Sequence, residues 1–487
     1  MYIPTIGLEI HIETKTKTKM FCSCANDPEE TKPNINVCPV CLAHPGSLPV
    51  INKSAIQTIA KLGLALNGKI DDYSQFDRKS YFYPDLPKGY QISQYEHPIV
   101  KGGSLKGIRI TRIHMEEDTG RLIHQIPTTY NLQPTTYSLV DFNRAGVPLI
   151  ELVTEPDIEN AEQAVAFAKE LQLILRYLDI SDADMEKGQM RVETNISLSD
   201  KKQETSDKKL GTKVEVKNLN SFKAVYGAIV YETKRQAEIL DEGGKIIQET
   251  RGWNDKTGKT ESQRLKESAH DYRYFPEPDL PPLNMSEFNL EELKAELSEL
   301  PKTKRNRFKQ EFKIPEEQIE ILVSDKGKAE YFEESATELK SELPITNYQL
   351  LVNYFVSDLQ GLMSERKTEI KNLKISPHEF AHFVFLIEKG TLSSRLAKDL
   401  LKKMFETGED PETLMAKENI SVIQDESALA QIVRKIIAEN PQAVKDYQNS
   451  KATAVQFMIG KAMAVTGGKA NPQILHKLFK EILDLSR

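Results

Sequence analysis

The stretch GLEIHIETKTKTKMF, residues 7–21, alternates apolar and polar side chains as a half-buried β-strand does. One face of this predicted strand carries Leu8, Ile10 and Ile12, and the other face carries Glu9, His11 and Glu13. A solvated polar face, which suits the lysines that follow, is one interpretation of the second set. A metal site is the other, because carboxylates and imidazole bind metal ions. The alternation therefore predicts a sheet and the side of it that could carry chemistry.

All four cysteines of the chain follow directly, within FCSCANDPEETKPNINVCPVC, residues 21–41. A C-x-C pair, Cys22 and Cys24, is separated by thirteen residues from a C-x-x-C pair, Cys38 and Cys41. Two short pairs of this kind resemble zinc knuckles, and four thiolates leave no open position for a substrate, so the spacing predicts a structural zinc site. Four free thiols are the simpler alternative. Disulfides are disfavoured because nothing in the sequence indicates an oxidising compartment.

Length and charge limit the classes of protein to consider. A chain of 487 residues is too long for one hydrophobic core, so we expect two or three domains. The formal net charge of −7 argues against a protein that coats nucleic acid through bulk charge. Residues 451–487 still hold six cations and two carboxylates, a local charge of +4 that suits an anionic partner or a solvated helix face.

No signal segment and no apolar run of roughly 20 residues is seen, which predicts a cytoplasmic protein without a membrane span.

The pattern of strands and helices changes along the chain. Between residues 63 and 151, Pro and Gly break the sequence into short strand-like pieces, which predicts a largely antiparallel sheet. A helix is expected within residues 154–178, and strands are expected again at residues 190–199 and 211–219. Beyond the proline-rich residues 272–283 the sequence is helical from about residue 290 onward, with a second boundary near residues 406–414. One helix start is clear: Ser376 is the N-cap, Pro377 takes the first position and Glu379 can close a capping box.

Common catalytic motifs are missing, and clusters of carboxylates remain. The sequence has no GxGxxG, HExxH or GxSxG motif, and GWNDKTGKT at residues 252–260 departs from a phosphate loop. The acidic clusters contain Glu9, then Glu116, Glu117 and Asp118, then Glu151, Glu155 and Asp157. Carboxylates on separate strands can hold Mg²⁺ against the phosphates of a nucleotide. Arg78, Lys79 and Lys88 could contact those phosphates and Tyr81, Phe82 or Tyr83 could stack on a base, although an aromatic-rich strand is more often plain core.

Several longer strings together resemble one protein family, the B subunits of the bacterial and organellar glutamyl/aspartyl-tRNA amidotransferase. The resemblance runs nearly end to end and rests on GLEIHIETKTKTKMFCSC, NVCPVCLAHPGSLPVIN, DRKSYFYPDLPKGYQISQY, HMEEDTGRLIH, SLVDFNRAGVPLIELVTEPD, GTKVEVKNLNSF and DYRYFPEPDLPPL. It implies an α+β cradle domain over residues 1–290 with the zinc knuckle as an insertion, an all-α helical domain over 291–408, and a helical tail domain over 409–487 that binds tRNA.

The resemblance also implies an activity. ATP phosphorylates the side-chain carboxylate of Glu on misacylated tRNA(Gln), or of Asp on tRNA(Asn), and ammonia then displaces the phosphate. The sequence contains neither an amidase signature nor a cysteine outside the predicted zinc site, so ammonia must come from a partner. By resemblance, that partner is an amidase (A) subunit, joined by a small C subunit.

The family's functional positions map onto residues of this chain. The resemblance implies that Mg²⁺ is held by Glu9, His11, Glu117 and Glu151, with Glu116 and Asp118 as neighbouring alternatives to Glu117. The ATP contacts expected from charge and aromatic character are Lys79, Tyr81 and Lys88. The zinc ligands are Cys22, Cys24, Cys38 and Cys41. One departure is visible where an Arg-Cys-Asp-x-Asn string is expected and Arg191, Val192, Glu193, Thr194 and Asn195 stand.

Three alternatives remain open. A non-catalytic tRNA-binding scaffold with a solvated acidic surface turns over no nucleotide. A ligase that forms adenylates releases pyrophosphate, whereas a kinase-like enzyme releases ADP. An archaeal-type relative that works with an asparaginase-like partner carries an inserted domain, for which 487 residues leave little room.

Overall fold

The computed structural model describes residues 2–123, 138–200, 210–265, 272–342, 348–418, 423, 425–448 and 453–484. Two cations of the basic tail, Lys451 and Arg487, lie outside these residues. The chain divides into two compact units, Met1–Pro301 and Lys302–Arg487. The first unit contains the sheets and the second is built of helices, in agreement with the order expected from the sequence. The predicted domain borders after residues 290 and 408 stay predictions.

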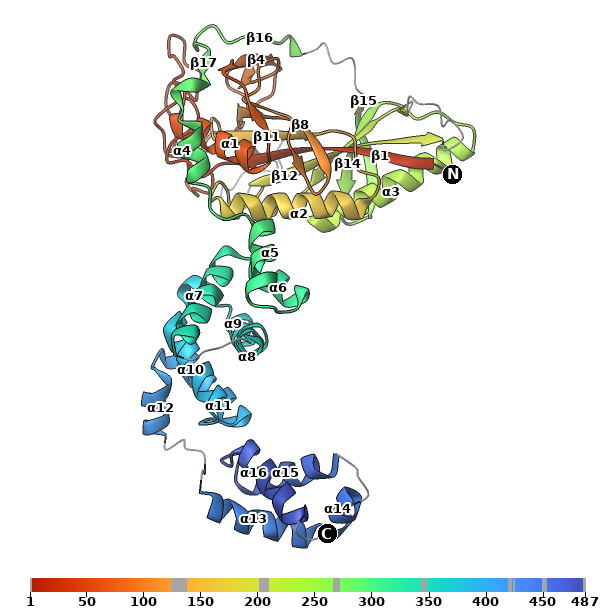
Figure 1. The fold of residues 1–487 in the computed structure, drawn as a ribbon. Coiled ribbons are helices and arrows are strands. Elements are labelled where there is room, and N and C mark those ends of the chain that lie inside the picture. The colour runs from red at the N-terminus through yellow and green to blue at the C-terminus, as the bar shows by residue number, and fades with distance from the viewer. Residues whose placement is uncertain are drawn as a thin grey trace, which may run out of the picture. The chain divides into compact units, whose positions relative to one another are not determined.

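A mixed sheet of ten strands organises the first unit (Figure 1). Its order among the described strands is β15-β14-β13-β12-β1-β11-β8-β6-β2, and β7 pairs with β8. The strand predicted around residue 10 is β1, Tyr2–Glu13, which runs antiparallel to β11, Pro148–Thr154, and to β12, Met190–Asp200. The sheet is largely antiparallel, as expected, with β13 and β14 as its parallel pair. The other strands are β2 Lys69–Ile70, β6 Val100–Lys101, β7 Ser104–Leu105, β8 Ile108–Glu117, β13 Val214–Leu219, β14 Glu249–Asn254 and β15 Lys259–Leu265.

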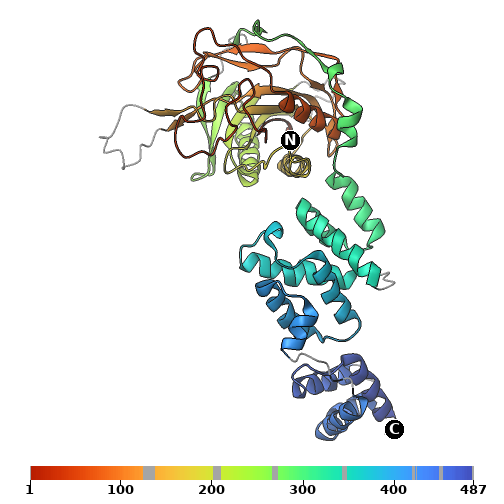
Figure 2. The same cartoon turned by 90° about the vertical axis from the view of Figure 1, so that its left-hand side faces the viewer.

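One face of this sheet packs on helices and forms the core. Figures 1 and 2 both show α2, Ala161–Tyr177, and α3, Phe222–Asp241, along the same face of the sheet. Ile10 and Ile12 are fully buried on that face, in register with Leu152 and Ile150 of β11. Complete burial of such a side chain contributes roughly 1.5–3 kcal/mol. Because neighbouring residues of a strand point to opposite sides, this packing leaves the polar residues of the same strands on the other face.

Smaller elements surround the main sheet. β4 Asp77–Ser80 pairs with β5 Tyr90–Ser93 and with β16 Phe275–Pro276, β9 Arg121–Ile123 pairs with β10 Leu139–Asp141, and β17 Leu283–Asn284 pairs with β3 Tyr73–Ser74. Two helices of the first unit are α1, Lys53–Ala65, and α4, Leu290–Ala295. Of the residues predicted to contact a nucleotide, Lys79 lies on β4, and Tyr81 and Lys88 lie in the segment between β4 and β5.

The second unit is helical. Its α-helices are α5 Pro301–Glu311, α6 Glu316–Val323, α7 Lys326–Glu342, α8 Gln349–Asn353, α9 Gln360–Glu365, α10 Pro377–Glu388, α11 Ser394–Thr407, α12 Pro411–Lys417, α13 Glu426–Glu439, α14 Pro441–Gln448, α15 Thr453–Val465 and α16 Pro472–Asp484. The predicted capping box of α10 is confirmed, since Ser376 and Glu379 exchange both hydrogen bonds. Helices α13 to α16 share an apolar cluster that includes Leu429 and Phe479. None of the helices in the described part of the chain is long and apolar enough to cross a membrane.

Candidate functional site

A row of polar residues crosses the open face of the sheet. Arg191 of β12 lies opposite His11 of β1, His11 lies opposite Glu151 of β11, and Glu151 lies opposite His114 of β8. Directly opposed residues share one face of a sheet and are near enough for their side chains to meet. Four strands that are distant in sequence therefore bring acidic and basic groups together.

The first cluster on this face is formed by Glu9, His11 and Glu151. The Nε2 atom of His11 lies 3.3 Å from Glu151 Oε2 and 3.9 Å from Glu9 Oε1. One ligand atom from each residue fits within a span of 4.8 Å, close enough to hold one metal ion. Carboxylate oxygens with an imidazole nitrogen can bind a divalent cation. Three of the four residues predicted to bind Mg²⁺ are thus brought together.

The pKa values in this cluster are shifted because its residues are buried and its carboxylates lie close together. Burial, and then the charge of Glu151, raises the pKa of Glu9 to about 7. Burial alone would lower the pKa of His11, but its hydrogen bond to Glu151 and the nearby carboxylates outweigh burial and raise it to about 9. The pKa of Glu151 is well below its usual value, because His114 and His11 outweigh the effect of burial. The carboxylates at this position therefore favour a cation beside them.

A second cluster adjoins the first and contains His114, Glu116 and Glu151. His114 Nε2 lies 3.4 Å from Glu116 Oε1 and 3.5 Å from Glu151 Oε2. Gln91 Nε2 donates to Glu116 at 2.9 Å and the Ser93 hydroxyl donates at 2.5 Å, so β5 fixes this buried carboxylate. His114 was not among the site residues expected from the sequence. The signal was present, because His114 and Glu116 repeat on β8 the spacing of two that Glu9 and His11 have on β1.

Glu117 lies on the other side of β8 from Glu116. Its Oε1 accepts a hydrogen bond of 3.0 Å from the backbone N–H of Ile92 and its carboxylate forms an ion pair with Lys88. Successive residues of a strand point to opposite faces, which separates Glu117 from the clusters. The structure does not bring Glu117 or Lys88 to Glu9 and His11, and their roles at the metal and at ATP stay predictions.

Lys79 and Tyr81 face the clusters. A cavity of about 380 Å³, which we call the carboxylate cavity, is lined by both residues together with Glu9, His11 and Glu151. Lys79 Nζ lies 3.6 Å from Glu116 Oε1. The carboxylates outweigh burial and hold the pKa of Lys79 well above its usual value, so Lys79 stays charged.

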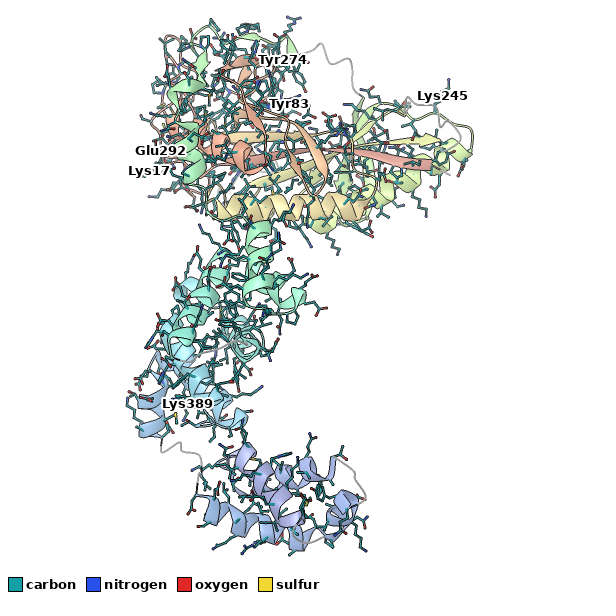
Figure 3. The ribbon with its side chains drawn as sticks, viewed as in Figure 1. Lys17, Tyr83, Lys245, Tyr274, Glu292 and Lys389 are labelled. Carbon is teal, nitrogen blue, oxygen red and sulfur yellow. The ribbon has the colours of Figure 1, made fainter. Side chains whose placement is uncertain are left out.

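Aromatic rings form one wall of the same cavity. The ring of Tyr81 lies 6.0 Å from that of Tyr272, and Lys79 Nζ lies 5.5 Å from the centre of the Tyr272 ring. Tyr274, which is labelled in Figure 3, also lines the cavity. The string that contains Tyr272 and Tyr274 was expected to mark a domain boundary, and neither residue was expected at a site.

Glu193, at the position that departs from the expected string, also lines the carboxylate cavity. Glu193, Glu215 and Glu9 form a further acidic group, and Lys217 Nζ lies 2.6 Å from Glu193 and 3.9 Å from Glu215. Lys217 thus offsets part of the negative charge at this end of the cavity.

The four cysteines lie together as predicted. Cys22, Cys24, Cys38 and Cys41 offer sulfur atoms that all lie within 4.8 Å of one another, and none of the four forms a disulfide. The Sγ atoms of Cys38 and Cys41 are 3.9 Å apart. A hydrogen bond with Cys22, followed by one from the backbone of Cys38 and the charge of Lys19, lowers the pKa of Cys41 to about 5 against the effect of burial. Four converging thiols of which one ionises readily fit tetrahedral zinc.

Comparison with known proteins gives matches to both units of the chain. Residues 4–291 match the family model described as the GatB/GatE catalytic domain, and residues 330–483 match the model described as the GatB domain.

Individual relatives match over nearly their whole length. The B subunit of the aspartyl/glutamyl-tRNA(Asn/Gln) amidotransferase from Persephonella marina is 45% identical over 488 residues, which cover 99% of both chains. The proteins of the same name from Carboxydothermus hydrogenoformans and Thermoanaerobacter pseudethanolicus are 45% and 44% identical over 490 residues, again with 99% of both chains covered.

Proposed function

Because the chain belongs to the family of aspartyl/glutamyl-tRNA(Asn/Gln) amidotransferase B subunits, we propose that it phosphorylates the side-chain carboxylate of an amino acid esterified to tRNA. The substrate is Glu on tRNA(Gln), Asp on tRNA(Asn) or both. Ammonia then converts the acyl phosphate to the amide. The complete enzyme is an ATP-dependent ligase that takes its nitrogen from glutamine, with an amidase (A) subunit and a small C subunit as partners.

The reaction needs activation because a carboxylate is a poor acylating agent. A carboxylate oxygen of the substrate attacks the γ-phosphorus of ATP and ADP leaves. Ammonia attacks the carbonyl carbon of the resulting acyl phosphate, and inorganic phosphate leaves with the oxygen that had been part of the carboxylate. The first step brings a carboxylate against a triphosphate and the second releases phosphate, so the site must supply positive charge beside the phosphoryl group.

The observation that carries this proposal is the convergence of Glu9, His11 and Glu151 with Lys79 around the carboxylate cavity. The donor set of carboxylate oxygens and an imidazole nitrogen fits Mg²⁺, which when bound offsets the charge of the triphosphate. The family resemblance implies Glu117 as a fourth ligand. Glu116 is the carboxylate that the geometry favours instead, because it shares the face and the cavity of the other three.

The other side chains of the carboxylate cavity have separate tasks. Lys79 keeps its charge and binds phosphate oxygens. His11 Nε2 contacts Glu151 at 3.3 Å and so orients this carboxylate, and the imidazole would become a metal ligand only after it loses its proton. Tyr81 and Tyr272 provide an apolar wall on which an adenine base stacks. The cysteine cluster lies outside this set and holds structural Zn²⁺.

The test is nucleotide turnover by the complex assembled with its A and C subunits and supplied with Mg-ATP and Glu-tRNA(Gln). ADP release that requires misacylated tRNA, and that falls by at least about 10²-fold in Glu151→Gln, supports the proposal. Lys245→Ala, which changes an exposed lysine outside the carboxylate cavity, is the matched control. Formation of AMP and pyrophosphate contradicts a kinase-like reaction, and tRNA binding without turnover favours a scaffold.

A further inference from the structure

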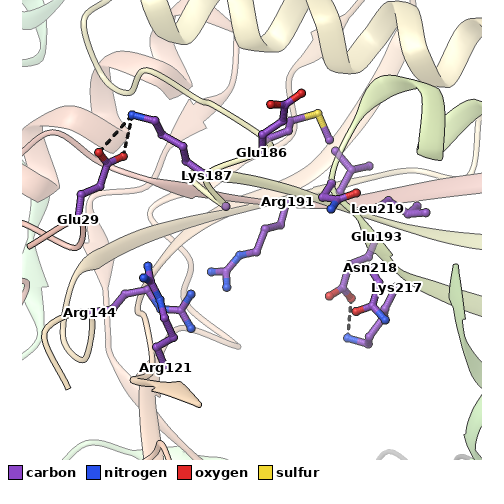
Figure 4. Close-up of a pocket in the computed structure, with 14 residues that line it drawn as sticks. Glu29, Arg121, Arg144, Glu186, Lys187, Arg191, Glu193, Lys217, Asn218 and Leu219 are labelled. Carbon is purple, nitrogen blue, oxygen red and sulfur yellow. Dashed lines mark hydrogen bonds and ion pairs between the residues drawn. The ribbon is translucent and has the colours of Figure 1, made fainter. Parts of the chain in front are cut away.

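A second and larger cavity adjoins the carboxylate cavity. It has a volume of about 810 Å³ and shares Arg191, Glu193 and Lys217 with the smaller cavity (Figure 4). We call it the arginine groove, after Arg121, Arg144 and Arg191 in its lining. The two cavities therefore have one wall in common, and a molecule that fills the groove reaches the carboxylates at that wall.

The arginine groove is cationic in an acidic protein. In the part of the chain that the structure describes, five cations line it, Arg121, Arg144, Lys187, Arg191 and Lys217, against three carboxylates, Glu29, Glu186 and Glu193. The lining thus has a formal charge of +2, whereas the whole chain has −7. A local excess of this kind attracts an anion that the rest of the surface repels.

Two of the arginines are held in place before any ligand arrives. Arg191 Nη2 donates to Asp118 Oδ2 at 2.7 Å. Arg144 donates to the backbone carbonyl oxygens of Thr119 and Gly120 at 3.1 and 2.8 Å, and its Nε lies 3.7 Å from Asp118. Asp118 is one carboxylate shared by two guanidinium groups, so positive charge remains on this wall.

Arg121 and Lys187 are more accessible. Arg121 is exposed on β9, and the one hydrogen bond of its side chain seen among the described residues goes to the carbonyl oxygen of Pro28 at 3.5 Å. Lys187 is exposed and lies 3.1 Å from Glu29. Figure 4 shows the Arg121, Arg144 and Arg191 side chains turned toward a common space. An exposed cation at the rim and fixed arginines inside suit a chain of phosphates rather than one ion.

The lining also separates two possible sources of phosphate. Among the residues that the structure describes, the groove lining includes the amides Asn218 and Asn220 and no aromatic ring, whereas the carboxylate cavity has Tyr81, Tyr272 and Tyr274. An ATP base therefore finds its stacking partners in the carboxylate cavity. Side-chain amides beside cations are typical of contacts to sugar–phosphate backbone and base edges.

We infer that the arginine groove binds the phosphodiester backbone of the single-stranded 3′ end of the aminoacyl-tRNA and directs its terminal ester past Arg191 and Lys217 into the carboxylate cavity. This inference rests on the proposed function, because it assigns the path by which that substrate enters. It makes Arg121 and Lys187 substrate-binding residues and makes Arg144 and Arg191 the fixed wall of the path.

The experiment measures equilibrium binding of tRNA(Gln) to the assembled three-subunit complex. Two ligands are compared, intact tRNA(Gln) and the same tRNA without its three 3′-terminal nucleotides. We expect truncation of the tRNA to weaken its binding to the wild type about tenfold, and Arg121→Ala to weaken the binding of intact tRNA to a similar degree. The two changes together should weaken binding little more than either change alone, because both remove the same contact. The dependence of log Kd on log salt becomes shallower by about 0.7 in Arg121→Ala.

Matched variants make the result specific. Lys187→Ala repeats the measurement at the other accessible cation, and Arg121→Lys retains part of the affinity because it keeps the charge. Lys245→Ala is the control, since Lys245 is exposed and lines neither the arginine groove nor the carboxylate cavity. Arg121 is exposed, so its replacement leaves the fold intact, which circular dichroism verifies.

Three outcomes overturn the inference. In the first, Arg121→Ala and Lys187→Ala bind intact tRNA as tightly as the wild type does; in the second, the effects of truncation and substitution on binding free energy add in full. In the third, the variants raise the KM for ATP while tRNA affinity stays unchanged. The last result assigns the groove to the nucleotide. Coupling between truncation and Arg121→Ala without tRNA-dependent ADP release leaves the groove assignment standing and contradicts the proposed function.

Discussion

Glu116 and Glu117 are neighbours in sequence, yet β8 turns them to opposite sides. We expect Glu116→Gln to raise the Mg²⁺ concentration for half-maximal ADP release by about 10–100-fold, because it removes a charge beside the metal cluster. Glu117→Gln changes the Mg²⁺ requirement by less than about twofold, whatever its effect on the rate. Titration of activity with Mg²⁺ measures both. A shift confined to Glu117→Gln would contradict the placement of Glu116.

The choice between these two residues illustrates what the sequence could not decide. Counted from Ile108 and Ile110, simple alternation puts Glu117 on the polar face. The register shifts opposite Val153 and Thr154, and the extra residue on β8 moves Glu116 to that face instead. Glu9 and His11 were predictable because no such shift interrupts their pairing with β11.

At the scale of one residue, Glu13 makes the free energy of unfolding depend on pH. Burial, followed by the charge of Asp118, raises the pKa of Glu13 from 4.5 to about 8, and its side chain shares a hydrogen bond with Asp118. The protonated carboxyl of Glu13 contributes to the free energy of unfolding. This contribution is fully present at pH values below the pKa of Glu13 in the unfolded chain, and it is lost as the pH rises through the pKa of Glu13 in the folded protein.

We therefore expect the Glu13→Gln variant, whose side chain stays neutral, to become more stable relative to the wild type as the pH rises. Urea unfolding at about pH 5.5 and about pH 8.5 should show the difference in unfolding free energy shifting toward the variant by more than about 1 kcal/mol. An equal difference at both pH values would mean that Glu13 is already ionised in the folded protein.

At the scale of elements, β1 is the strand on which the first unit depends. Ile10 is fully buried between β11 and β12. Ile10→Ala should lower the free energy of unfolding by about 2–5 kcal/mol, since it leaves a cavity in a closely packed core. Ile247→Ala, at a side chain that is 63% exposed, should change it by less than about 0.5 kcal/mol. Equal effects in denaturant titrations would contradict the central position of β1.

Some elements were predictable and others were not. Periodicity located β1 and α2, and capping residues located the start of α10. Helix α3 was not expected from the sequence, and without it the parallel pairing of β13 and β14 was missed. A parallel pair requires a long crossover, usually a helix, so the two omissions have one cause.

The loop that follows β1 contains the predicted zinc site. We expect about one zinc ion per chain, because four sulfur ligand atoms lie within 4.8 Å of one another. Cys38→Ser should remove most of the metal and lower the melting temperature, whereas Ser47→Ala in the same loop should do neither. Metal analysis of the purified chain decides the matter, and much less than one zinc in the wild type would support four free thiols instead.

At the scale of the molecule, local charge accounts for how an acidic chain could work on RNA. The whole chain has a net charge of −7, yet the arginine groove of the first unit is cationic. In the second unit, Lys461, Lys469, Lys477 and Lys480 lie in the described part of the basic tail. A local excess of cations attracts phosphates even where the total charge is unfavourable. The groove could not be predicted from sequence, because its residues come from five separate segments that only folding brings together.

The central claim is that the substrate carboxylate itself receives the phosphoryl group. The most direct test uses Glu-tRNA(Gln) with ¹⁸O in the side-chain carboxylate, Mg-ATP and the complete enzyme, followed by mass analysis of the inorganic phosphate released. The account predicts that each phosphate formed with glutaminyl-tRNA carries one oxygen from the carboxylate. Phosphate without the label, whose fourth oxygen then comes from water, or label that appears in AMP, would contradict it.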